Sequence, residues 1–151
     1  MFSKFSIYFD GACHNKKNEP SGMGIGVAVY IDSTFFYEFS VAEYVGLGTS
    51  NIAEWNACVT AMSIIKQASE DCIIDEDTIV KIYSDSQLIT NQFNGLWKMN
   101  DNEFKARYKA AWMLLRESNI GEEFKLITWI PREQNEQADK LSKIGLKKQK
   151  K

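Results

Sequence analysis

Apolar and polar residues alternate with a period of two near the start of the chain, which is the spacing of a strand with one buried face. Phe5, Ile7 and Phe9 share one face of the first such run, and Asp32-Ser33 marks a tight turn between the second and third runs. Because no helical segment separates these runs, we expect antiparallel neighbours. The strands are predicted at Ser6–Asp10, Ile25–Tyr30 and Phe35–Val41, with a polar loop over Gly11–Gly24.

After residue 50 the apolar spacing changes to that of amphipathic helices separated by short strands. Three strands followed by helix–strand units predict an α/β fold, with a mixed sheet and helices on its faces. This order disfavours flavodoxin-like and response-regulator folds, which begin with a strand–helix–strand unit. The predicted helices are Asn51–Ala68, Gln87–Phe93, Glu103–Glu117 and Glu133–Leu146, and the predicted strands are Ile79–Ser84 and Phe124–Ile130.

The length of 151 residues fits one domain, which we place at residues 1–146, followed by a basic tail at 147–151. No segment is apolar over a bilayer's thickness, and the N-terminus lacks the features of a signal peptide, so no membrane association and a cytoplasmic location are expected. Three widely spaced cysteines, Cys13, Cys58 and Cys72, argue against a disulfide framework. The formal net charge of −2 means that any phosphate-binding surface must be local.

Two aspartates stand at the ends of predicted strands. Asp10 ends the first strand directly before Gly11, and Asp85 follows the strand Ile79–Ser84. Ligands gather at the carboxyl ends of strands in sheets of this kind, which favours a functional interpretation of Asp85, whereas Asp10 taken alone is better explained by a turn. The structural alternatives are that Asp10 begins a turn and that Asp85 caps the next helix.

Two further acids lie on predicted helices. Glu54 heads the apolar stripe of the first helix, where an unpaired carboxylate is costly to bury. The alternative is a capping box formed with Asn51. Asp139 lies one turn after Asn135 on the last helix, and its alternative is a solvated surface charge. Four carboxylates gathered at one sheet edge would suit Mg²⁺ or Mn²⁺ rather than Zn²⁺.

Four short segments carry these acids in an order that resembles the motifs of type 1 ribonuclease H. They are Asp10-Gly11-Ala12, Thr49-Ser50-Asn51-Ile52-Ala53-Glu54, Ser84-Asp85-Ser86-Gln87 and Asn135-Glu136-Gln137-Ala138-Asp139. Each is weak alone, but the four together extend the resemblance from about residue 5 to residue 144. The resemblance implies a ribonuclease H-like fold, with a five-stranded mixed sheet, its first three strands antiparallel and helices on both faces.

The same resemblance implies an endonuclease that hydrolyses the RNA strand of RNA–DNA hybrids and leaves 3′-hydroxyl and 5′-phosphate ends. It assigns Asp10, Glu54, Asp85 and Asp139 as catalytic ligands of two Mg²⁺ ions, with Mn²⁺ as an alternative metal. It also assigns Thr49 to a DNA phosphate, Asn51 and Gln87 to the minor groove, and the backbone from Gly11 to Asn15 to the RNA strand. A monomer is expected.

The sequence departs from the family pattern at three places. The loop before the last helix lacks the histidine that many members carry, so Glu133 is a candidate substitute, and His14 is expected to be a solvated loop residue. Ser50 stands where an asparagine is common in the family. Some members carry a basic protrusion between their middle helices, and the segment 94–101 is too short and too mixed in charge to form one. Two other functions stay open: a non-catalytic nucleic-acid-binding module, and another metal-dependent nuclease on the same fold.

Overall fold

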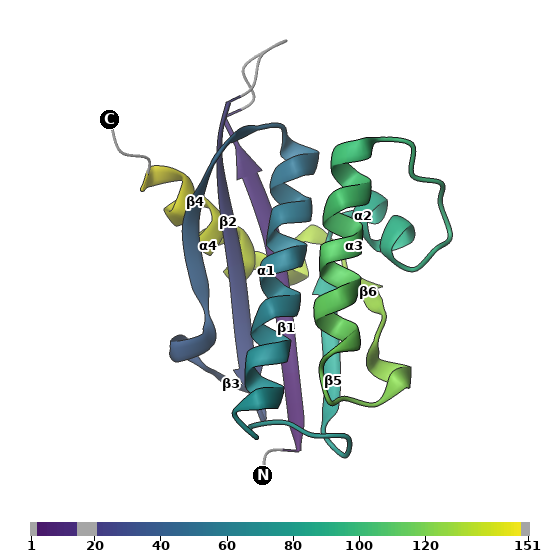
Figure 1. Cartoon of the computed structure of the whole chain (residues 1–151). Coiled ribbons are helices and arrows are strands. Elements are labelled where there is room, and N and C mark those ends of the chain that lie inside the picture. The colour runs from purple at the N-terminus through teal and green to yellow at the C-terminus, as the bar shows by residue number, and fades with distance from the viewer. Residues whose placement is uncertain (1–2, 15–20, 149–151) are drawn as a thin grey trace.

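A mixed β-sheet forms the middle layer of the computed structural model, which describes residues 3–14 and 21–148 (Figure 1). Strand β1 (Lys4–Cys13) pairs antiparallel with β2 (Ser21–Ile31) and parallel with β5 (Ile79–Ser84). Strand β6 (Ile127–Trp129) extends the sheet parallel to β5. The predicted α/β class, with its first strands antiparallel, is therefore confirmed.

The third strand is interrupted, which differs from the continuous run predicted over Phe35–Val41. Strand β3 (Thr34–Phe35) and strand β4 (Val41–Gly48) both pair with β2, and a 3-10 turn at Tyr37–Phe39 separates them. The Ser40 hydroxyl accepts a hydrogen bond from the Val29 N–H at 3.1 Å and donates one to the Phe36 carbonyl at 3.0 Å. This side chain takes a strand partner's place, so six strands occupy five positions in the sheet.

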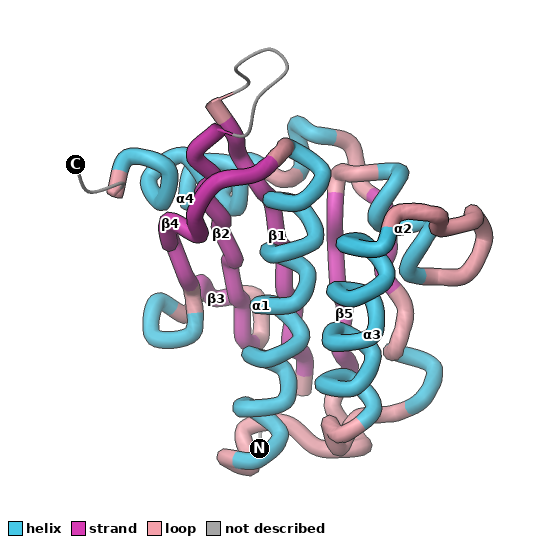
Figure 2. Tube along the Cα trace, turned by 45° about the horizontal axis from the view of Figure 1, so that its top comes forward, coloured by secondary structure: helices cyan, strands magenta, loops and turns pink. Residues whose placement is uncertain are grey.

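Helices cover both faces of the sheet (Figures 1 and 2). Helix α1 (Ser50–Glu70) packs on β1 and β2, and helix α3 (Asn102–Arg116) packs beside α1. The shorter helix α2 (Gln87–Phe93) lies against β5 and β6. On the opposite face, α4 (Glu136–Lys147) packs on β2, β4 and β1. The predicted stripe of α1 is confirmed, because Cys58, Ala61, Ile65 and Ala68 are all fully buried.

Several element ends differ from the sequence prediction. Strand β1 continues to Cys13, which pairs with Met23, so the connection to β2 is shorter than the predicted loop Gly11–Gly24. The segments Glu122–Phe124 and Arg132–Gln134 are 3-10 turns, which shorten the predicted last strand and last helix. Of the helices in the described part of the chain, none combines the length and apolar character needed to cross a bilayer.

Candidate metal centre

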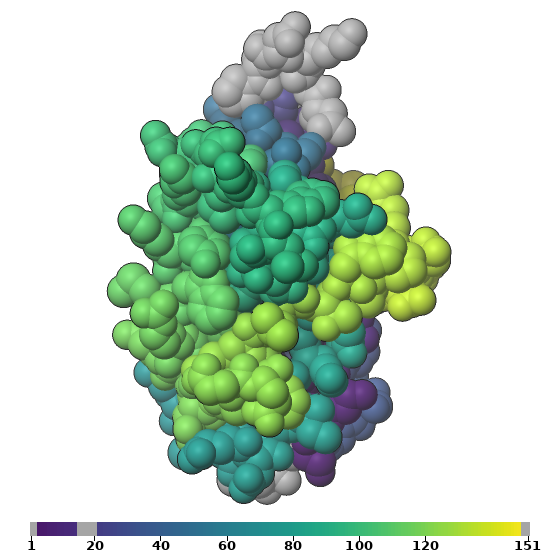
Figure 3. Space-filling view, turned by 90° about the vertical axis from the view of Figure 1, so that its right-hand side faces the viewer, coloured from purple at the N-terminus to yellow at the C-terminus, as the bar shows by residue number. Residues whose placement is uncertain are grey.

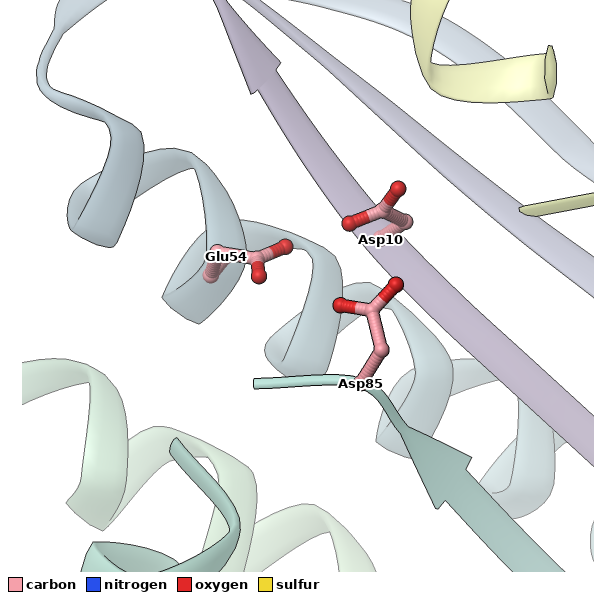
Figure 4. A group of neighbouring side chains, drawn as sticks. All are labelled: Asp10, Glu54 and Asp85. Atoms are coloured by element: carbon pink, nitrogen blue, oxygen red, sulfur yellow. The ribbon is translucent and has the colours of Figure 1, made fainter. Parts of the chain in front are cut away.

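Three carboxylates converge where β1 and β5 end (Figure 4). Asp10 lies on β1, Asp85 directly follows β5, and Glu54 extends from α1 toward both. One oxygen of each group lies within 4.8 Å of one oxygen of each other group. Because β1 and β5 are parallel and pair Phe9 with Ser84, the next residues on the two strands emerge side by side.

A glycine brings α1 close enough for Glu54 to reach the sheet. A Cβ at Gly11 would lie 2.4 Å from the Ala53 carbonyl carbon, so a larger residue would force α1 away from β1. The Gly11 N–H donates hydrogen bonds to the carboxylates of both Asp10 and Glu54. The alternative role of Glu54 in a capping box with Asn51 is not observed. Helix α1 is capped by Thr49, whose hydroxyl accepts a hydrogen bond from the Ile52 N–H at 3.3 Å.

Asp85 is held at both its side chain and its main chain. The Asn135 amide donates a hydrogen bond to Asp85 Oδ2 at 3.2 Å, and the Trp129 indole N–H donates to the Asp85 carbonyl at 3.0 Å. Helix α2 is capped by Ser86, whose hydroxyl accepts from the Ile89 N–H. The alternative role of Asp85 as the cap of that helix is therefore excluded.

The cluster is electrostatically unfavourable without a cation. Burial, reinforced by Glu54 and Asp85, raises the pKa of Asp10 far above its ordinary value. Burial likewise raises the pKa of Glu54 to about 7. It also raises the pKa of Asp85, against the lowering effects of the Asn135 hydrogen bond and the Arg132 charge. Such a group of acids is stabilised either by protons or by a metal ion.

Asp139 lies at the edge of this cluster, outside the group of three. It is in the first turn of α4, its side chain is 28% exposed, and its Oδ2 forms an ion pair with Lys143 Nζ at 3.0 Å. It nevertheless contributes to the raised pKa of both Asp10 and Asp85. The structure therefore brings three of the four predicted ligands together and places the fourth beside them.

The donor set fits a hard divalent cation. All the converging atoms in the described cluster are carboxylate oxygens, which Mg²⁺ and Mn²⁺ accept. The thiol of Cys58 is fully buried one turn after Glu54 on α1, and burial raises the pKa of this thiol, so Cys58 is a packing residue.

The other predicted residues lie around the cluster. Thr49 and Asn51 are exposed at the start of α1, and Gln87 is exposed at the start of α2. His14 is exposed directly after β1, and Asn15 lies outside the described residues. Glu133 is exposed and lines a cavity of about 440 Å³ together with Tyr8 and Tyr30.

Two residues that act on the carboxylates have no role in the prediction from sequence. Arg132 lowers the pKa of both Glu54 and Asp85 through its charge. Asn135 is 1% exposed and hydrogen-bonds Asp85. Asn135 is the first residue of the motif that ends at Asp139, so the motif carries a signal for it, whereas nothing in the local pattern distinguishes Arg132 from a surface charge.

Comparison with known proteins agrees with this geometry. Residues 3–147 match the family model described as RNase H. A ribonuclease HI of Halobacterium salinarum is 31% identical over 140 residues, which are 92% of this chain and 62% of that protein. The chain thus spans less than two thirds of that relative, and 34% of the Mycobacterium tuberculosis "Bifunctional protein Rv2228c", to which it is 27% identical.

Solved structures with the same fold include two ribonuclease H1 enzymes. The crystal structure of RNase H1 from Halobacterium salinarum aligns with a TM-score of 0.77 at 27% identity, covering 97% of this chain and 100% of that one. LC11-RNase H1 in complex with an RNA/DNA hybrid aligns with a TM-score of 0.77 at 25% identity, covering 95% and 97%. With the matched residues spanning nearly its whole length, the chain belongs to the RNase H family.

Proposed function

We propose that this protein is an endoribonuclease that hydrolyses the RNA strand of RNA–DNA hybrids and leaves 3′-hydroxyl and 5′-phosphate ends. The observation that carries the proposal is the cluster of Asp10, Glu54 and Asp85 at the carboxyl ends of β1 and β5. Membership of the RNase H family and the hybrid bound in the LC11-RNase H1 structure support the choice of substrate.

Asp10, Glu54 and Asp85 would hold divalent metal, with Asp139 completing the set from α4. When bound, two Mg²⁺ ions supply an activated water for in-line attack on the scissile phosphate and stabilise the leaving oxygen. The Gly11 N–H keeps the Asp10 and Glu54 carboxylates facing each other. The position of Asp139 at the exposed edge suits a group that orients the attacking water.

Residues at the helix N-termini would hold the substrate. Thr49, Asn51 and Gln87 are exposed at the starts of α1 and α2, which both border the carboxylates. We propose that Thr49 contacts a DNA phosphate, that Asn51 and Gln87 enter the minor groove, and that the backbone of Gly11 to Asn15 approaches the RNA. The segment between α2 and α3 lies on the face shown in Figure 3. Trp97 in this segment is 48% exposed and is available to stack on the DNA.

The remaining expectations belong to the same proposal. The enzyme would act as a monomer in the cytoplasm, as one domain over residues 1–146 with a basic tail at 147–151. Mn²⁺ would substitute for Mg²⁺, because both accept carboxylate oxygens. Glu133, which is exposed and lines the same cavity as Tyr8, would substitute for the family's loop histidine.

A cleavage assay with three duplexes tests the proposal and its rivals together. Strand-labelled RNA–DNA hybrid, double-stranded RNA and double-stranded DNA are incubated with Mg²⁺, with Mn²⁺ or with EDTA. We expect cleavage of RNA in the hybrid alone, dependent on metal, and abolished in Asp10→Asn and Asp85→Asn. Hybrid binding without cleavage would identify a binding module, and cleavage of the DNA duplex would identify a different nuclease.

A further inference from the structure

Asn135 joins three elements of the site through one side chain. It lies at the start of α4, is 1% exposed, and its Nδ2 donates to the Phe9 carbonyl at 3.0 Å and to Asp85 Oδ2 at 3.2 Å. Phe9 directly precedes Asp10 on β1. The amide therefore ties the strand that carries one acid to the carboxylate of another.

Both groups that bond to the Asn135 Nδ2 are hydrogen-bond acceptors. Both partners of Nδ2 are oxygens, so an amide rotated by 180° would place Oδ1 against two acceptors. In the observed orientation, Oδ1 is buried and has no hydrogen-bond partner within the described part of the chain. A buried acceptor without a hydrogen bond lowers the stability of the folded state.

The Asn135 side chain does not cap α4, although its position at the start of the helix favours that role. Asparagine is among the preferred N-cap residues, because its side-chain oxygen can accept a hydrogen bond from the first turn of a helix. At the start of α4 the Asn135 side chain makes no such bond. An orphaned oxygen and an uncapped helix both lower stability, so neither explains why an amide points at Asp85.

We infer that Asn135 is a positioning residue, which fixes the Asp85 carboxylate relative to Asp10 so that both can bind one divalent ion. This inference rests on the proposed function only in that the three carboxylates bind metal. The Trp129 indole restrains the Asp85 main chain, so Asn135 controls the remaining freedom, which is the direction of the Asp85 carboxylate. Residues that orient ligands in this way commonly affect metal affinity by about 10–100-fold.

Metal binding to the free protein tests this inference without using activity. Mn²⁺ is titrated calorimetrically into wild type, Asn135→Ala and Asn135→Ser, and the same proteins are melted thermally in EDTA. Serine is itself a favoured N-cap but is too short to bridge Phe9 and Asp85. We expect Asn135→Ser to keep near wild-type stability in EDTA while its Mn²⁺ dissociation constant rises about 10-fold or more.

Asn94 provides a matched control. This asparagine also clamps a distant strand with two hydrogen bonds, from Nδ2 to the Ile127 carbonyl at 2.8 Å and to Oδ1 from the Ile127 N–H at 3.0 Å. It contacts none of the three clustered acids through these bonds. Asn94→Ala should lower the melting temperature and leave the Mn²⁺ dissociation constant unchanged.

The outcomes separate this inference from the proposed function. If wild type binds Mn²⁺ and both Asn135 variants bind it equally well, Asn135 is not a positioning residue. The same conclusion follows if Asn94→Ala weakens binding as much as Asn135→Ser does, because the effect is then general destabilisation. If wild type neither binds Mn²⁺ nor cleaves hybrid, the proposed function itself is wrong.

Discussion

Among the individual residues of the site, Asp10 makes the stability of the fold depend on pH. Its burial and its acidic neighbours hold its pKa far above that of a free aspartate. The folded protein therefore retains a proton on this group at pH values where the unfolded chain has lost it. Because folding then takes up protons, this contribution to stability is full below the ordinary carboxyl pKa and is lost progressively as the pH rises toward the raised pKa of about 10.

Without metal, the stability of the folded protein should therefore decrease as the pH rises. In EDTA, the melting temperature of wild type should fall between pH 5.5 and pH 8.5, and Asp10→Asn should fall less and be the more stable protein at pH 8.5. The amide keeps the size of the carboxyl but removes the charge that Glu54 and Asp85 oppose. Glu76→Gln, which changes an exposed acid, should follow wild type. A steeper decline for Asp10→Asn than for wild type would contradict the prediction.

The role of Asn135 could not be predicted from the sequence, unlike the positions of the four acids. The four acids were identifiable because each stood at a strand end or on a helix in a recognisable motif. The role of Asn135 depends on contacts with Phe9 and Asp85, which lie 126 and 50 positions away in the chain. Local patterns do not encode such distant partners, so the sequence predicts no role for this residue.

At the scale of elements, the cap of α1 has both a structural and a proposed binding role. Thr49→Ala removes the hydroxyl that accepts from Ile52 and should cost about 1 kcal/mol, or about 2–4 °C in melting temperature. Thr49→Ser should restore the cap. If Thr49 also contacts a DNA phosphate, Thr49→Ala will reduce hybrid cleavage while Mn²⁺ binding stays unchanged. Loss of metal binding in Thr49→Ala would exclude this division of roles.

The contact between α4 and the sheet depends on glycine in β2. A Cβ at Gly26 would lie 2.2 Å from the Ala138 carbonyl oxygen and 2.3 Å from the Ser142 nitrogen, both backbone atoms. Gly26→Ala should therefore push α4 outward, lower stability by about 1–3 kcal/mol and displace Asp139. Gly48→Ala is the control, because its Cβ would meet the flexible side chain of Met23. Equal losses in thermal melts would argue against the close approach of α4.

Elements of this chain were predicted well where their residues determine them locally. The long stripe of α1 and the strand β5 have the expected pattern and were placed to within a few residues. The third strand was misread because its apolar residues continue through Phe36 and Phe39, whereas Ser40 hydrogen-bonds back to β2 and ends the pairing at Phe35. A side chain that replaces a backbone partner leaves no periodic signal.

At the scale of the whole molecule, metal binding and folding should be linked. Only the folded chain brings the three carboxylates together, so a divalent ion should raise the melting temperature, by an amount that grows with the logarithm of the ratio of its concentration to its dissociation constant. Protons compete for the same oxygens, and the increase should be larger at pH 8 than at pH 6. Thermal melts with and without Mn²⁺ at both pH values measure this. Asp85→Asn should show little increase at either pH, and an equal increase in that variant would place the metal elsewhere.

The position of β1 at the centre of the sheet also determines when a newly folding chain becomes competent. Its pairing with β2 joins neighbouring segments, whereas its pairing with β5 and its bond to Asn135 close long loops, which is slow. The first hairpin and α1 can therefore assemble before Asp85 and α4 arrive. A refolding chain will regain helix and sheet before it regains the ability to bind a metal ion. Metal-dependent activity should therefore appear only when Asp85 and α4 have docked on the sheet.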